Sequence, residues 1–406
     1  MASPVDSRYY AKSGEIIYAG IRLHVSLTFA DGVADVVDLS LKFPDINGHA
    51  VSLKVTTGTL PASMTLDPLG KTLTYDGTAG QNTCSVEITS YANAPSLTFT
   101  NGSGVVPVMA GIVFPKGVVT GGIGATEAGL FVNVLRTWND GSAKHAAVTG
   151  VCAANQRVTF NQSPNSGTAL VAADIAAAAP TATVTIDAGG GPEVVSLAAL
   201  LATPHETYLS SPGIVECHYR GQHGSSRLYT EFQVRLFSDS SCFVRAIVED
   251  PSIIRTGASY TYDATVEIGG VTVESLTDYV HYNNAAWVAE RWIGATQHDI
   301  VTRHDTYQIT QTELVPAYGM ASTVAESKLA ELPTAYVVGD RLNYREKFSG
   351  TGYSGQIGLL PMWEASYLVS ADDRALRCIM AHFKAALLYA IDWRNSSGEI
   401  LNPTDN

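Results

Sequence analysis

Short alternations of apolar and polar residues run through the first hundred residues of the chain. Residues 23–29 place Leu, Val, Leu and Phe at every second position, and Val86 and Ile88 repeat this pattern. Dipeptides that supply the positive φ of tight hairpin turns separate the alternations: Asp31-Gly32, Asn47-Gly48, Asp76-Gly77 and Asn101-Gly102. Short strands with frequent turns are typical of a sandwich of antiparallel strands. We therefore predict a β-sandwich over residues 1–104.

The same period of two continues through the middle of the chain. Apolar alternations at 215–220, 228–237 and 242–249 predict a meander, with a further strand over 260–268. An Ala-rich stretch, residues 168–179, interrupts the pattern and predicts a short surface helix that ends before a proline. We predict that residues 105–297 form a barrel-like or sandwich β-domain, so the protein as a whole should be mainly β.

From Arg303 onward the apolar period changes to about 3.6, which is typical of helices. Pro361 suits a first helical position, and Ser370 with Asp373 makes a capping-box start for a second helix. The apolar stripe of that second helix comprises Leu376, Met380, Phe383, Leu387 and Ile391. We predict a small helical region over residues 298–406. Because no further helix follows in this sequence, we expect the stripe to pack backwards on its own chain or outwards on another.

Composition points to a surface with few charges. Charged residues make up 16% of the chain, against about 25% in typical soluble domains. A β-rich chain with many Thr, Ser and Gly residues is one explanation, and a surface covered by neighbouring subunits is the other. A mean hydropathy of +0.09 without any long apolar run argues against a membrane span. The net charge of −13 argues against nucleic acid as a partner.

The cysteines and the N-terminus indicate the cellular compartment in which the protein is made. Five widely spaced cysteines without a Cys-x-x-Cys pair argue against a disulfide framework or a zinc site. The opening Met-Ala-Ser-Pro-Val-Asp lacks the pattern of a signal peptide. We expect synthesis in a reducing cytoplasm and release through assembly and lysis. No sequence motif implies a cofactor.

Several clusters carry candidate chemistry, each with a plainer structural alternative. His298-Asp299 and His304-Asp305 offer four potential metal ligands, but such pairs also cap turns. Asp372 and Asp373 are carboxylates of the kind that hydrolyse glycosides, and also of the kind that begins a helix. The hairpin around Trp138 can present an aromatic face to a sugar ring, or bury that ring in a core.

Three motifs, which follow one another in the same order along the chain, resemble one family. They are Arg136-Thr-Trp-Asn-Asp-Gly-Ser-Ala-Lys-His145, Arg303-His-Asp-Thr-Tyr307 and Gly-Gln-Ile-Gly-Leu-Leu-Pro-Met-Trp363. They resemble elements of bacterial and phage proteins similar to the rhamnogalacturonan lyases with an N-terminal barrel and an α/α-toroid. Asp392-Trp393-Arg394 reverses the family's usual pair, and a full toroid needs more helices than this sequence holds. Residues 60–78 also resemble bacterial Ig-like or cadherin-like modules.

The resemblance implies a glycan site between barrel and helices. A lyase must neutralise a uronate carboxylate and supply a base, and the matched positions carry Arg, His and Tyr. The candidate glycan-binding residues are Arg303, His304, Asp305, Tyr307, Trp363 and Arg394. The alternative is that these residues form a structural seam between the two regions.

Two classes of function follow. We favour a structural protein of a tailed-phage virion, in the tail fibre, tail tip or capsid surface, with other virion proteins and a host glycan as partners. The alternative is a polysaccharide lyase or a related carbohydrate-active enzyme. For the first class we expect a homo-oligomer, with a trimer favoured, whose interface is Leu376, Met380, Phe383 and Leu387.

Overall fold

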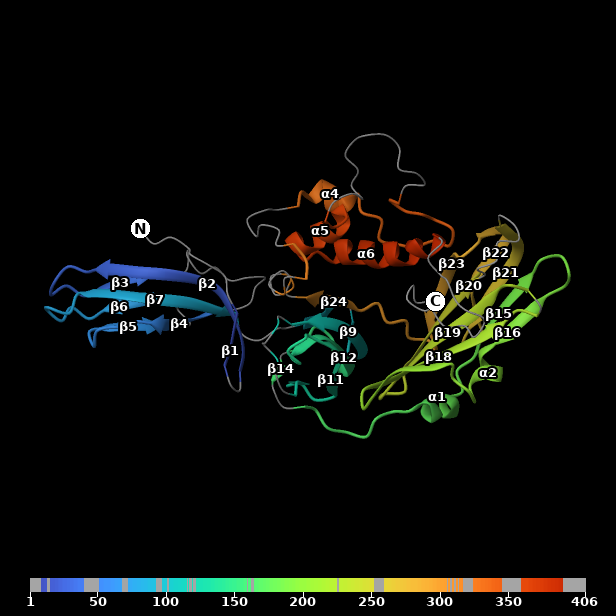
Figure 1. Cartoon of the computed structure of the whole chain (residues 1–406), viewed down its shortest axis with the longest axis horizontal. Coiled ribbons are helices and arrows are strands. Elements are labelled where there is room, and N and C mark those ends of the chain that lie inside the picture. The colour runs from blue at the N-terminus through green and yellow to red at the C-terminus, as the bar shows by residue number, and fades with distance from the viewer. Residues whose placement is uncertain are drawn as a thin grey trace.

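A computed structural model describes most of the 406 residues of the chain. The described residues are 9–12, 15–39, 51–67, 72–92, 97–100, 102–114, 116, 119, 122–158, 160–161, 164–224, 226–251, 259–304, 306, 309, 312, 314–316, 324–344 and 359–389. The fold is mainly β, with antiparallel sheets and a small helical region toward the C-terminus, as the hydrophobic pattern predicts. Figure 1 shows the N-terminal strands at one end of the molecule and the largest sheets at the other.

The N-terminal strands form two sheets, ordered β1-β2-β7-β4 and β3-β6-β5, around a core of their own. Their bounds are β1 (Tyr9–Lys12), β2 (Glu15–Thr28), β3 (Asp35–Asp38), β4 (Val51–Thr57), β5 (Met64–Asp67), β6 (Thr72–Tyr75) and β7 (Thr83–Ala92). Leu73 and Tyr75 are fully buried between the sheets, because alternate residues of β6 face inward. The predicted β-sandwich is therefore present.

A smaller β unit follows, with its own core centred on Phe99, Ile112 and Phe114. Its sheets are β11-β12-β9, β13-β8-β24 and β10-β14. Their bounds are β8 (Leu97–Thr100), β9 (Val105–Val113), β10 (Gly124–Ala125), β11 (Leu130–Thr137), β12 (Ala143–Ala153), β13 (Arg157–Val158), β14 (Phe160–Asn161) and β24 (Val301–His304). β8 thus pairs with strands on the far side of the predicted domain limits at residues 104 and 297. The limits themselves remain predictions.

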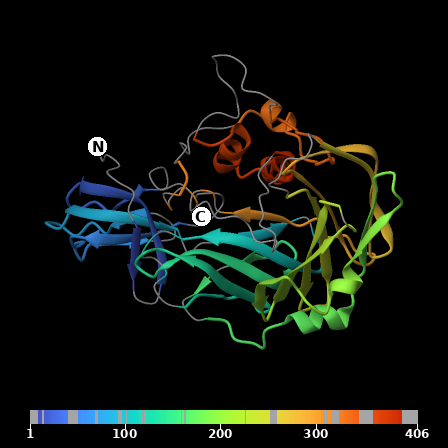
Figure 2. The same cartoon turned by 45° about the vertical axis from the view of Figure 1, so that its right-hand side comes forward.

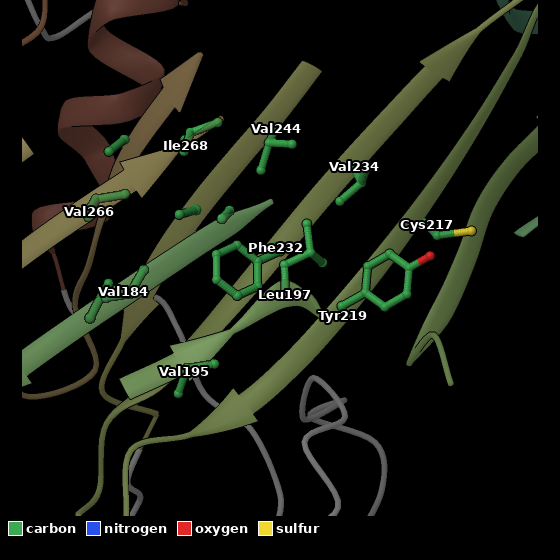
Figure 3. Close-up of a cluster of buried hydrophobic side chains, with 14 of the residues drawn as sticks. Val184, Val195, Leu197, Cys217, Tyr219, Phe232, Val234, Val244, Val266 and Ile268 are labelled. Carbon is green, nitrogen blue, oxygen red and sulfur yellow. The ribbon is translucent and has the colours of Figure 1, made fainter. Parts of the chain in front are cut away.

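The larger sandwich packs a sheet of order β16-β15-β21-β22 on a sheet of order β17-β18-β19-β20-β23. The bounds of the strands are β15 (Ala182–Asp187), β16 (Glu193–Ser196), β17 (Glu206–Ser211), β18 (Ile214–Gln222), β19 (Tyr229–Phe237), β20 (Cys242–Glu249), β21 (Ser259–Ile268), β22 (Val271–Tyr282) and β23 (Ala286–Trp292). Two short helices, α1 (Ala172–Ala178) and α2 (Leu197–Leu200), belong to the same part of the chain. Figure 3 shows Tyr219, Phe232 and Val244 pointing into this core. The central β region therefore has two main cores, and a smaller cluster of Ala147, Leu209, Ile214 and Phe237 connects β12 with β17, β18 and β19.

The helical region comprises α4 (Glu326–Ala330), α5 (Met362–Ser370), α6 (Asp373–Ala385) and the short 3-10 helix η1 (Ala386–Leu388). Figures 1 and 2 both show α5 and α6 above β24. The helix starts differ slightly from the prediction: Pro361 precedes the first helical residue, and Asp372 caps α6 by accepting a hydrogen bond from the backbone N–H of Arg374. Ser370 instead donates its hydroxyl to Ser366 O at the end of α5.

All five cysteines are buried and free, so none of them forms a disulfide framework. Gly189 and Gly191, both with positive φ, lie in the turn that joins β15 to β16, so this glycine run is a hairpin loop. Among the described residues, no helix has the length and apolar character needed to cross a bilayer.

A buried chain of hydrogen bonds ties β21, β22 and β23 together. Trp287 Nε1 donates to the Tyr262 hydroxyl at 2.8 Å, and that hydroxyl lies 2.7 Å from His281 Nδ1. His281 Nε2 lies 2.8 Å from Ala285 O, which can only accept, so Nε2 carries the proton and Nδ1 accepts from Tyr262. A single hydroxyl therefore satisfies two buried partners.

Replacing Tyr262 with Phe should destabilise the protein. The change leaves the Trp287 N–H and His281 Nδ1 without a partner in a dry core, at a cost of about 2–4 kcal/mol in the free energy of unfolding. Urea denaturation measures this. Tyr260→Phe is the matched control, because Tyr260 is a partly buried neighbour on the same strand whose ring contact with Arg227 survives the change. Equal effects of the two substitutions would contradict the prediction.

Acid should destabilise the protein through two buried histidines. Burial lowers the pKa of His223 and of His281 to about 4. Between pH 6.5 and 4 the unfolded chain therefore binds more protons than the folded one, so stability is complete above about pH 6.5 and falls toward pH 4, by about 3 kcal/mol for each histidine. Urea denaturation between pH 4 and 6.5 measures how the free energy of unfolding changes with pH. This dependence should become shallower in His281→Gln. An unchanged slope in that variant would show that His281 does not contribute.

Candidate functional site

Pairing of β24 with β8 brings Arg303 to the start of α6. Arg303 Nε and Nη2 donate to the two carboxylate oxygens of Asp373 at 2.9 and 3.2 Å. Asp373 is the first residue of α6, where a carboxylate also interacts favourably with the helix dipole. The Asp373 hydrogen bond and charge raise the pKa of Arg303 above its usual value, so the guanidinium stays charged.

His304 lies next to this ion pair and is held at both ring nitrogens. Its Nε2 lies 3.0 Å from Gly111 O on β9, so Nε2 donates. Its Nδ1 therefore accepts from the Tyr367 hydroxyl of α5 at 2.8 Å. The oxygen of the same hydroxyl accepts from the His304 backbone N–H at 3.2 Å. Burial lowers the pKa of His304 and raises that of Tyr367 to about 12, so both groups are neutral near pH 7. The pair joins three segments that are far apart in the sequence.

A cavity of about 610 Å³ adjoins these residues. Its walls include Arg303, His304, Asp372, Asp373 and Arg374. Arg374 forms ion pairs with Asp372 and with Glu326 of α4, at 2.9 and 2.6 Å. The cations in the wall of the cavity therefore already have carboxylate partners from the chain itself.

The structure separates the predicted site residues. Arg303 and His304 share this cavity, whereas Trp363 is 1% exposed and stacks on His382 at 3.9 Å in the helical core. Trp363 therefore packs in the helical core and does not line a cleft. The predicted positions 305, 307 and 394 lie outside the described residues.

Two of the predicted interface residues are exposed on α6, and one of them, Met380, also lines a cavity between α6 and the β units. Met380 is 48% exposed and Phe383 is 59% exposed. Leu376 and Leu387 are partly buried. The helix packs on its own chain through a different set, namely Ala375, Cys378, Ala381, His382 and Ala385. Small residues on this inner face let α6 approach the bulky Trp363 and Tyr367 of α5, which explains why the larger side chains lie outside.

Sequence reasoning missed a polar face on the five-stranded sheet. A single row of residues crosses all five strands in register: Glu206, His218, Gln233, Arg245 and Glu290. Lys384 of α6 pairs with Glu290 at the end of this row. The signal was present in the strand sequences, because Glu216, His218 and Arg220 alternate with apolar residues, as do the polar residues of β19.

His218 lies among three carboxylates on this face. Its ring nitrogens are 3.3 Å from Glu216, 3.4 Å from Glu206 and 3.7 Å from Glu231. Burial opposes protonation, but the hydrogen bond to Glu216 and the three negative charges outweigh it and raise the pKa of His218. Arg235 also pairs with Glu216 at 2.8 Å. The polar face is thus a network of opposite charges in contact, which compensates the cost of burying them.

The charged residues of these two regions hold the helices on the β units, and we call this region of contact the joint. Arg303, Arg377 and Lys384 each pair with a carboxylate across the boundary between the helices and the β units. Asp299, a candidate metal ligand from the sequence, is the partner of Arg377 at 2.6 Å. Within the described ranges, no group of three His, Cys, Asp or Glu side chains has the geometry to hold a metal ion.

The joint should depend more on Tyr367 than on Arg303. Tyr367→Phe removes the hydroxyl that partners His304 in a buried setting and should cost about 1–3 kcal/mol of stability. Arg303→Gln breaks an ion pair whose arginine side chain is 55% exposed, and pairs of that kind contribute about 1 kcal/mol or less. Urea denaturation, with hydrogen exchange of α5 and α6, compares them. A larger loss from Arg303→Gln would contradict this ranking.

Comparison of the chain with protein-family models, with curated proteins and with solved structures found no match.

Proposed function

We propose that this protein is a structural component of a tailed-phage virion, in the tail fibre, tail tip or capsid surface, where it contacts a host glycan. The observation that carries the structural role is the engagement of His304, whose two ring nitrogens are bound to Tyr367 and Gly111. A general base needs a free lone pair within hydrogen-bond reach of its substrate. The groups that could perform chemistry at this joint hold the helices on the β units instead.

The choice of a virion among structural roles relies on the resemblance described above. In the described part of the chain, its motifs include the β11–β12 hairpin, Arg303 and His304 of β24, and Pro361 to Trp363 at the start of α5. His304 contacts Tyr367, which follows the last of these motifs in α5. The matched residue His304 therefore takes part in the contact between β24 and the helices.

A polysaccharide lyase remains the second candidate. The observation in its favour is the cavity of about 610 Å³ that Arg303 and His304 both line. A lyase would need Arg303 to neutralise a substrate carboxylate, but Asp373 already accepts hydrogen bonds from Arg303 Nε and Nη2 and neutralises its charge. The structural role requires no such rearrangement and is the one we favour.

The outward face of α6 supports assembly with a second copy of the chain. Phe383 and Met380 are the most exposed apolar side chains of α6, whose packed face carries other residues, and Met380 also lines the cavity of about 460 Å³ between α6 and the β units. Burying such side chains contributes about 1.5–3 kcal/mol each. The charged fraction of 16% is also low for a surface that faces only water. We propose a symmetric homo-oligomer, favouring a trimer, with this face at its interface.

Phe383→Asp should disrupt that assembly, because it places a charge in an apolar contact. Light scattering of the purified wild-type chain should give a mass above 43.0 kDa, and the variant should give a lower mass. Purified phage particles should contain the wild-type chain and retain less of the variant, as measured by mass spectrometry.

Val337→Asp is the matched control, because Val337 is 64% exposed and lies outside any helix or strand. It should leave both readouts unchanged. A monomer that the Phe383 substitution does not alter, together with particles that lack the chain, would refute the structural proposal and favour the enzyme.

A further inference from the structure

The segment that leads from β23 to β24 lies where the larger sandwich meets the smaller β unit (Figure 1). Residues of this segment line three adjoining cavities. Their volumes are about 880, 190 and 460 Å³. The first and second share Trp292, His298 and Ile300. The second and third share Met109, Ile300 and Thr302. Because each cavity shares walls with the next, we treat them as one elongated site, the junction groove.

We propose that the junction groove binds an extended, uncharged polysaccharide chain. This inference deepens the proposed function and rests on it for the class of ligand. It centres the glycan on Trp292 and His298, which are not among the six residues expected from the sequence; of those six, the described residue His304 lines the third cavity. The size and lining of the groove, its aromatic side chains and its charge balance each support this assignment.

Trp292 provides an aromatic platform in the groove. Its ring lies 5.6 Å from that of Phe237 and 5.2 Å from that of Phe243, so two neighbours hold it in place. Its Nε1 donates to His298 O at 3.0 Å, which fixes the orientation of the indole. The side chain is partly exposed and lines two of the three cavities. A rigid aromatic ring of this kind offers the apolar contact on which the C–H face of a sugar can pack.

Polar side chains next to this platform suit the hydroxyl groups of a sugar. Asp239, Gln297 and His298 line the same cavity of about 880 Å³. Gln297 Nε2 donates to Trp292 O and Gly294 O, which holds its amide in place. Neither ring nitrogen of His298 has a hydrogen-bond partner among the residues that the structure describes, so both are available to a ligand. These groups donate and accept, as a hydroxyl-rich ligand requires.

The charge balance of the groove favours an uncharged ligand. Three carboxylates line the cavities, from Asp239, Asp299 and Glu290, and three cations, from Arg235, Arg377 and Lys384. Arg377 and Lys384 are paired with Asp299 and Glu290, and Arg235 is paired with a carboxylate of the sheet behind it. An excess of positive charge, which a polyanion such as nucleic acid or polyuronate would need, is therefore lacking in these walls.

The polar lining also disfavours an apolar protein segment as the occupant. Such a segment would remove water from Asp239, Gln297 and His298 and could offer them hydrogen bonds only from its backbone. Buried polar groups without partners cost free energy. A polysaccharide replaces those hydrogen bonds while its C–H faces contact the aromatic ring.

Isothermal titration of the purified chain tests the proposal. The probes are linear neutral oligosaccharides of glucose, galactose, mannose, rhamnose and xylose in a series of lengths, with polygalacturonate as the charged comparison. We expect a neutral series to bind, with affinity rising with length until the groove is filled. Trp292→Ala should weaken binding about tenfold or more. Trp138→Ala is the matched control, because Trp138 is a partly buried tryptophan outside the groove, and it should not change the affinity.

His298→Ala keeps the proposal testable if Trp292→Ala fails to fold. It removes the imidazole but leaves the backbone carbonyl that accepts from Trp292, so the fold should survive and the affinity should fall. Circular dichroism verifies the fold of each variant. Binding that only Trp138→Ala weakens, preference for polygalacturonate, or no neutral ligand at millimolar concentration would each overturn the proposal. Because these measurements use the isolated chain, their failure is distinct from absence of the protein from particles.

Discussion

The antiparallel pairing of β24 with β8 is the contact on which the arrangement of the protein depends. β8 lies between β13 and β24, and its residues 97 and 98 face His304 and Arg303 across the ladder. This register sets β24 beside β9, where His304 donates to Gly111 O, and under the helices, where the same ring meets Tyr367. About two hundred residues separate the paired strands, so the joint forms only once the intervening β units have folded.

Charge pairing then fixes how the helices sit on the β units. Arg303 and Arg377 pair with carboxylates through two hydrogen bonds each, and Lys384 reaches the edge of the five-stranded sheet at Glu290. Paired forks of this kind restrict orientation more than they add stability, because several of these groups are exposed to water. The network around His218 extends the same principle into a more buried setting, where an unpaired charge would be costly.

The ion pairs and hydrogen bonds between the helices and the β units help to distinguish the possible functions. At the joint, histidine and arginine side chains that could serve catalysis are instead bound by neighbouring residues, which favours an architectural role. On α6, Phe383 is left in water, which favours a partner. The junction groove differs from both, because His298 has no hydrogen bond to its ring nitrogens within the described part of the chain and lies beside a fixed indole. A binding function therefore fits the groove better than it fits the joint.

Local patterns in the sequence were sufficient for the mainly β fold, the N-terminal sandwich and the helix around residues 373–385, because strand and helix periods and turn residues act over a few positions. The sequence did not determine which face of α6 packs inward, that Trp363 is buried in the helical core, or that Trp292 and His298 share a groove with β9. Those outcomes depend on which distant strands pair and on how side-chain volumes fit between elements. Such contacts are long-range, and a single sequence carries no local signal for them, so only the tertiary structure decided them.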